Sequence, residues 1–185
     1  MTRVMAASVS AGQAGQAGRA VAAGQASQAP QASQASQASQ ASQASQASQA
    51  SQALQAALAA EDAAIFGYGV AGAHLSGSRK SVAEQDWTEH NEARDTLTAM
   101  ISALGATPAA AQAFYRLPFE VTDAASAAKL AAYLEEGVAR AYLGIVAVSD
   151  RRLRTFGALA MQPPAERAAF WRGTTEAFPG LYASD

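Results

Sequence analysis

The chain contains no cysteine among its 185 residues. Disulfide bonds, thiolate metal sites and cysteine nucleophiles are therefore excluded. Residues 1–53 contain no acidic residue at all, and their only bases are Arg3 and Arg19. Over the whole sequence the formal net charge is −2, so the charge balance gives no indication of a nucleic-acid partner.

Long apolar segments and common catalytic motifs are missing as well. No stretch approaches the roughly 20 apolar residues that a transmembrane helix needs. The first 24 residues lack the continuous apolar segment of a secretory signal. The sequence also shows no Gly-rich phosphate loop and no Ser-His-Asp arrangement. We therefore expect a cytoplasmic protein without a membrane partner, and we assign no catalytic residue.

The N-terminal part repeats the triplet Gln-Ala-Ser, in phase from Gln25 to Ser51. A period of three drifts by about 60° per triplet around a helix of 3.6 residues per turn, so no helix face is kept. The largest apolar side chain of the Gln-Ala-Ser triplet is the methyl group of Ala, which leaves little to bury. We predict residues 1–51 as a low-complexity tract, either disordered or a fraying helix that Pro30 would interrupt.

The remaining part, residues 52–182, is long enough to bury a core of its own. Large apolar residues recur there at every third or fourth position, which is the spacing of helices that bury one face. The fourth helix reaches Pro163 and then either kinks or restarts as a short fifth helix, because proline is tolerated in a first turn. The predicted elements are helices over 52–76, 81–104 and 123–149, a fourth helix from Asp150, and a turn over 76–81.

Residues 105–122 connect the second and third helices and combine Pro108 and Pro118 with several aromatic residues. A connection of this length with apolar content favours an ordered crossover that packs over the helices. No segment shows the alternation of a β-strand. The sequence therefore predicts an all-α protein, a four-helix bundle with a long crossover between helices two and three.

Five segments resemble, in order and spacing, the actinobacterial family DUF4439, a ferritin-like domain of unknown function. They are LQAALAAEDAAIFGYGVAGAHL, HNEARDTL, GATPAAAQAFYRLPFEVTD, LEEGVARAYLGIV and AFPGL. The resemblance covers about residues 52–181. It implies a ferritin-like four-helix bundle, and it brings no established activity.

Ferritin-like proteins include di-iron proteins that place one Glu on each of two helices and a Glu-x-x-His on each of the other two. Glu61 lies where the Glu of the first helix would be, and Glu135 or Glu136 could stand for the other. Trp87 lies three residues before His90, and the fourth helix contains no His. We therefore expect no metal and no cofactor. Iron or manganese remains the alternative, with Glu61, His90 and Glu136 as candidate ligands.

Glu61 lies in the middle of the apolar stripe of the first helix, where a buried carboxylate needs a partner. Arg94 lies about as far after the predicted turn as Glu61 lies before it, which puts the two at similar depth. We hypothesise a Glu61–Arg94 ion pair with His90 beside it. This buried polar cluster would fix the register of an Ala-rich bundle.

These observations predict a ferritin-like bundle without a di-iron site that acts as a structural or interaction module, most simply as a homodimer. Two alternatives remain open. One is a metal-dependent oxidase or iron-handling protein with a degenerate site. The other is a carrier that holds a small apolar ligand between the helices.

Overall fold

The computed structural model describes residues 28–173, which form five α-helices and, within that range, no strand. None of these helices is long and apolar enough to cross a membrane. The all-α prediction is confirmed, whereas the predictions for residues 1–27 lie outside the described residues. The helices are α2 (Gln28–Ala73), α3 (Gly77–Ala103), α4 (Ala124–Val146), α5 (Arg151–Ala160) and α6 (Gln162–Arg172).

The described part of the repeat is helical. The chain divides into two units, one ending at Ala44 and one beginning at Ser45. In the first unit α2 starts at Gln28, so Pro30 lies in the first helical turn, where its missing N–H is not needed. Every side chain from 33 to 49 is exposed. Of the two alternatives for the repeat, disorder or helix, the structure shows helix from Gln28 onward.

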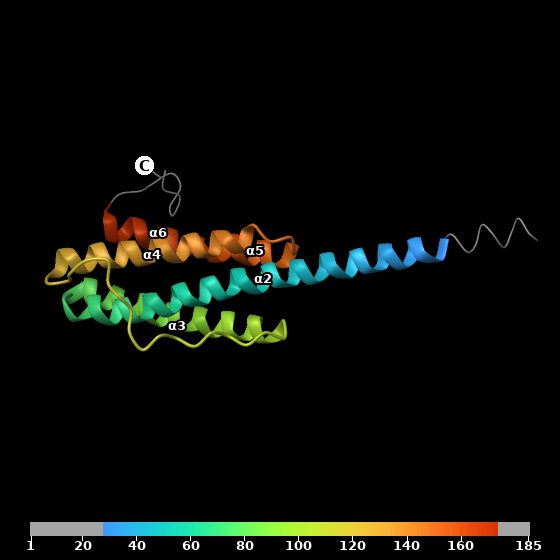
Figure 1. Cartoon of the computed structure of the whole chain (residues 1–185). Coiled ribbons are helices and arrows are strands. Elements are labelled where there is room, and N and C mark those ends of the chain that lie inside the picture. The colour runs from blue at the N-terminus through green and yellow to red at the C-terminus, as the bar shows by residue number, and fades with distance from the viewer. Residues whose placement is uncertain (1–27, 174–185) are drawn as a thin grey trace, which may run out of the picture. The chain divides into compact units, whose positions relative to one another are not determined.

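The second unit is a bundle of four helical segments around an apolar core, in which the short helices α5 and α6 together form the fourth segment. Figure 1 shows α2 beside α3, while α5 and α6 follow one another along α4. The inward positions of α2 recur at the three- and four-residue spacing that the sequence predicted. The largest apolar side chains that are fully buried in this core are Leu54, Leu58, Tyr68, Leu97, Ile101, Leu130, Val138 and Ile145.

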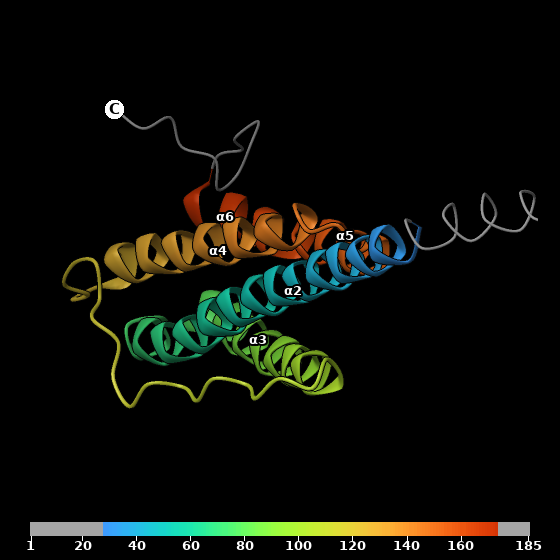
Figure 2. The same cartoon turned by 45° about the vertical axis from the view of Figure 1, so that its right-hand side comes forward.

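The long crossover between α3 and α4 packs along α2, as predicted. The Gln55 side chain donates to the Thr107 carbonyl oxygen at 2.7 Å and accepts from the Ala109 N–H at 2.9 Å. The Phe66 ring contacts the ring of Phe114 at a centroid distance of 5.7 Å. Figures 1 and 2 show the crossover returning to the end where α3 starts, so α3 and α4 run in the same direction.

The helix boundaries agree with the prediction in some places and differ in others. The first turn is shorter than predicted, since α3 already begins at Gly77, whose φ of 56° only glycine adopts readily. α4 begins after a capping box in which Asp123 accepts from the Ser126 N–H and the Ser126 side chain accepts from the Asp123 N–H. The fourth helix ends at Ala160, and α6 restarts with Pro163 and Pro164 in its first turn. Of the two alternatives for this segment, a kinked continuation or a short fifth helix, the structure shows the short fifth helix.

We expect a chain that begins at Ser45 to be as stable as the full chain, within about 0.5 kcal/mol. The reason is that Ala50 is the first buried side chain of α2 among those whose burial is described, while residues 33–49 before it are exposed. Urea unfolding followed by circular dichroism measures this difference. A chain that begins at Leu58 serves as the control, since it lacks the fully buried Leu54 and should lose stability. A large loss on removing residues 1–44 would contradict the prediction.

Candidate functional site: a buried polar cluster

Each of four helices sends two polar or aromatic side chains into the middle of the bundle. On α2 and α4 the two residues are seven positions apart, and on α3 and α6 they are four apart, so each pair shares one helix face. All are buried except Arg167, whose side chain is 16% exposed. The polar cluster consists of Glu61 and Tyr68 on α2, Asp86 and His90 on α3, Glu135 and Tyr142 on α4, and Arg167 and Trp171 on α6.

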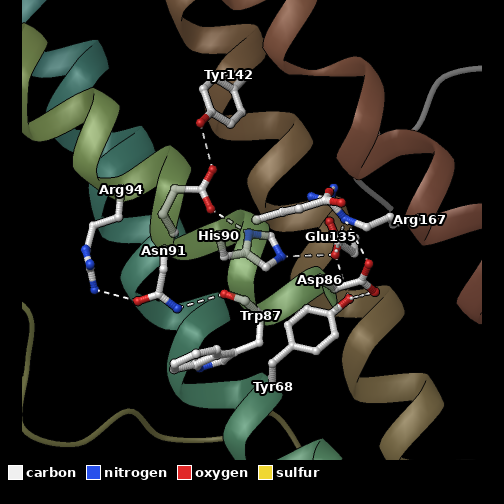
Figure 3. Close-up of polar contacts among 11 residues, drawn as sticks. Tyr68, Asp86, Trp87, His90, Asn91, Arg94, Glu135, Tyr142 and Arg167 are labelled. Carbon is white, nitrogen blue, oxygen red and sulfur yellow. Dashed lines mark hydrogen bonds and ion pairs between the residues drawn. The ribbon is translucent and has the colours of Figure 1, made fainter. Parts of the chain in front are cut away.

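His90 bridges the carboxylates of the two neighbouring helices, as Figure 3 shows. Its Nδ1 lies 2.6 Å from Glu61 Oε2 and its Nε2 lies 3.1 Å from Glu135 Oε1. The other oxygen of Glu61, Oε1, accepts from the Tyr142 hydroxyl at 2.7 Å. A ring that contacts a carboxylate at each nitrogen is best satisfied when both nitrogens carry a proton. His90 therefore acts as a buried cation.

Glu135 is the carboxylate on which the cluster converges. Its Oε1 accepts from the Tyr68 hydroxyl at 2.6 Å and from Arg167 Nε at 2.8 Å, in addition to His90. Arg167 Nη1 also donates to Glu89 Oε2 at 2.7 Å, where α3 reaches the rim of the cluster. Hydrogen bonds to a charged group are the stronger kind. α2, α3 and α6 are thus all tied to one oxygen atom of α4.

Asp86 joins α3 to α6 through a second carboxylate. Its Oδ2 accepts from Trp171 Nε1 at 2.8 Å and lies 3.1 Å from the Tyr68 hydroxyl. Its Oδ1 lies 3.9 Å from Arg167 Nε. The Tyr68 hydroxyl carries a single hydrogen, which serves the shorter contact with Glu135.

The electrostatics follow from burial and from these contacts. Burial by itself would lower the pKa of His90, but the hydrogen bonds and charges of Glu135 and Glu61 raise it to about 9. Burial by itself would raise the pKa of Glu135, but the contacts with His90 and Arg167 lower this pKa below its ordinary value. Burial raises the pKa of Asp86. The cluster therefore combines ionised Glu135 with two cations, His90 and Arg167, at neutral pH.

The prediction of a Glu61–Arg94 ion pair is wrong. Glu61 and His90 lie together in the cluster, as expected, but Arg94 lies at the edge of the inward face of α3 with a side chain 34% exposed. Its guanidinium donates to Asp95 and Asn91 on its own helix. A long basic side chain at such an edge can keep its charge in water, which costs less free energy than burying it in the core. The buried carboxylate of Glu61 therefore has other partners.

Glu136, proposed from the sequence as a ligand candidate, lies outside the polar cluster. Its Oε1 is bonded by Arg172 Nη1 at 2.8 Å. The neighbouring Glu135 is the one that faces His90. Sequence reasoning missed Tyr142 and Arg167, although Tyr142 lies two helical turns after Glu135 and Arg167 is one of only two bases in α6.

The polar cluster does not fit a di-iron centre. Both oxygens of Glu61 and Oε1 of Glu135 already accept hydrogen bonds, and both nitrogens of His90 contact carboxylates. A metal ligand on His90 would need a ring nitrogen free of a proton. Among the described residues, no group of three His, Asp or Glu side chains is arranged to hold a metal ion.

A cavity of about 200 Å³ opens beside the cluster, lined by residues of α2, α3, α4, α5 and the start of α6. Its polar lining consists of Glu61, Glu89, Thr96, Tyr142 and Arg167. A space of this size holds several water molecules. Solvent can therefore reach one side of the ion pairs.

The chain is similar to a family whose description gives no function and to the crystal structure of a hypothetical protein. The model of a family described as "Domain of unknown function (DUF4439)" matches residues 53–183. The crystal structure of a conserved hypothetical protein from Mycobacterium tuberculosis is similar, with 34% identity and a TM-score of 0.66 over 68% of this chain and 96% of that chain. No curated protein matches the chain.

The polar cluster predicts a loss of stability at alkaline pH. The pKa of His90 is about 9 in the folded protein against an ordinary value of 6.5. The stabilisation from the protonated ring is therefore complete below pH 6.5 and is lost as the pH rises through 9. The shift corresponds to about 3 kcal/mol. Urea unfolding between pH 6 and pH 10 measures it.

Two variants control for other titrating groups. His90→Gln should be less stable at neutral pH and should lack most of this pH dependence. His74→Gln changes the chain's other histidine, which is exposed, and should keep the full dependence. An alkaline loss of equal size in His90→Gln would show that another group is responsible.

Proposed function

The chain belongs to the DUF4439 family, and we propose that its folded part is a non-enzymatic structural and interaction module of the ferritin-like type. In this proposal, ion pairs take the place of a metal centre in the middle of the bundle. The four-helix arrangement, the long crossover and the inward carboxylates on α2 and α4 support the ferritin-like relationship. We further propose that the module acts in the cytoplasm.

The observation that carries the proposal is the position of Arg167. Its Nε lies 2.8 Å from Glu135 Oε1, on the same oxygen that His90 contacts at 3.1 Å. A permanent positive charge at this place repels a divalent cation. The same charge is needed by the bundle, because a buried carboxylate left without its partner typically costs 3–5 kcal/mol, on the order of a large core mutation.

An interaction role is supported by large apolar side chains that remain half exposed or more. They come from the crossover, α4, α5 and α6, so the outer surface of the bundle offers apolar contact area on several elements. We propose a homodimer as the working form. The residues are Phe114, Tyr133, Leu159 and Phe170.

Native mass spectrometry of the purified protein tests both parts of the proposal. We expect a dimer mass, and after incubation with Fe²⁺ or Mn²⁺ we expect no bound metal, because His90 and Arg167 occupy the carboxylates. Elemental analysis of the protein as purified gives an independent measurement. About two iron or manganese ions per chain would overturn the proposal in favour of a metal-dependent oxidase or iron-handling protein. A monomer mass would remove the dimer alone.

A groove between α2 and α3 favours a second candidate function, the binding of a small apolar ligand. Its volume is about 490 Å³, within the range of small-molecule sites. Gly69 and Gly72 keep it open, since a Cβ on either would meet nothing within 4 Å. The Trp87 indole, 44% exposed, lines it together with the Tyr68 ring, and Figure 3 draws both rings on the same side of His90.

A neutral aromatic probe, N-phenyl-1-naphthylamine, tests this second function. Binding in the groove should quench the fluorescence of Trp87, and Gly72→Leu should weaken it at least about tenfold by filling the groove. Gly144→Leu is the matched control, because Gly144 is exposed on α4 and its Cβ would also meet nothing. Equal probe binding by both variants would exclude the groove as the site.

A further inference from the structure

We propose that Arg167 is the built-in occupant of a cation site, and that shortening its side chain turns the polar cluster into a binding site for a divalent cation. This inference rests on the proposed function, in which ion pairs take the place of a metal centre. According to this inference, Arg167 alone determines whether the polar cluster is an ion-pair network or a metal site.

The first argument is the number of carboxylates that surround the single positive charge of the Arg167 guanidinium. Three carboxylates from α3 and α4 lie within 4 Å of it. Glu89 Oε2 is 2.7 Å from Nη1, while Glu135 Oε1 is 2.8 Å and Asp86 Oδ1 3.9 Å from Nε. Oxygen ligands of this kind suit cations such as Mn²⁺ and Mg²⁺. The monovalent guanidinium thus lies among three carboxylates, of which it shares only Glu135 with the second cation, His90.

The second argument is a carboxylate oxygen that the present network leaves unused. Glu135 is fully buried, and its Oε2 has no hydrogen-bond partner among the described residues. Three donors meanwhile crowd onto Oε1 of the same group. Buried polar atoms normally find partners. A metal ion bound by Glu135 would use this second oxygen, which arginine does not reach.

The third argument is access. Arg167, Glu61 and Glu89 line the cavity of about 200 Å³ beside the cluster. Truncation of Arg167 adds the volume of its side chain to this cavity and brings Glu135 and Asp86 to its wall. An ion from solvent can then reach the carboxylates without unfolding of the bundle.

Arg172 provides a matched comparison on the same helix. It lies five residues after Arg167, its side chain is 21% exposed, and its Nη1 bonds the Glu136 carboxylate at 2.8 Å. Glu136 lies outside the polar cluster, and the 200 Å³ cavity is not lined by Arg172. Removal of Arg172 therefore also deletes a partly buried ion pair of α6 but exposes no set of converging carboxylates.

The experiment compares Mn²⁺ binding by the wild-type chain with that by Arg167→Ala, Arg167→Lys and Arg172→Ala. The free-Mn²⁺ signal in electron paramagnetic resonance counts the bound ions, and the melting temperature is followed with increasing Mn²⁺. Arg167→Ala should bind about one ion per chain, at least about tenfold more tightly than wild type, with a saturable rise in melting temperature. Arg167→Lys keeps the charge and should not bind, and neither should Arg172→Ala.

Two further measurements keep the test decisive. The double variant Arg167→Ala/Glu135→Gln should lose the gained affinity. If Arg167→Ala does not fold alone, addition of Mn²⁺ should restore its helical circular dichroism. No binding and no restored folding in Arg167→Ala, or equal binding in Arg167→Lys or Arg172→Ala, would overturn the inference. Tight binding by the wild-type chain would instead overturn the proposed function.

Discussion

The bundle depends on the neutralisation of one buried carboxylate, that of Glu135. Its Oε1 receives hydrogen bonds from Tyr68, His90 and Arg167, which come from three different helices. A carboxylate in such a place is tolerated only when it is paired and hydrogen-bonded. The requirement links the four helical segments at one point, so that a shift of any of them along the bundle axis would leave a charge unpaired.

The break between α5 and α6 serves this requirement. A straight continuation of α5 is prevented by Pro163 and Pro164, which can stand only in a first turn. The restarted helix places Arg167 against Glu135 and Trp171 against Asp86, one helical turn apart. α6 is thereby held by directional polar contacts in addition to its few buried apolar residues. Such contacts favour one register over others more strongly than alanine methyl groups do.

The chemical character of the site also follows from this pairing. His90 and Arg167 neutralise Glu135, a carboxylate that a metal ion would also need, and protonation of His90 makes its nitrogens donors rather than ligands. The groove along Gly69 and Gly72 lies on the other side of Tyr68 and depends on missing side chains rather than on charge. Ion-pair core and open groove are thus separate features of one bundle, and each supports a different functional proposal.

The amino-acid sequence by itself determined the helices, the long crossover and the burial of Glu61 and His90, because these follow from the local spacing of apolar residues and from prolines. The tertiary structure decided the partners. Arg94 is near Glu61 in helix register but lies at the edge of its stripe, whereas Arg167 contacts Glu135 from 32 residues away and Glu89 from 78. A local pattern carries no information on such contacts, since they depend on how separate helices are rotated about their axes when they pack. For that reason the burial of Glu61 beside His90 was readable from the sequence, and the contact of Arg167 with Glu135 was not.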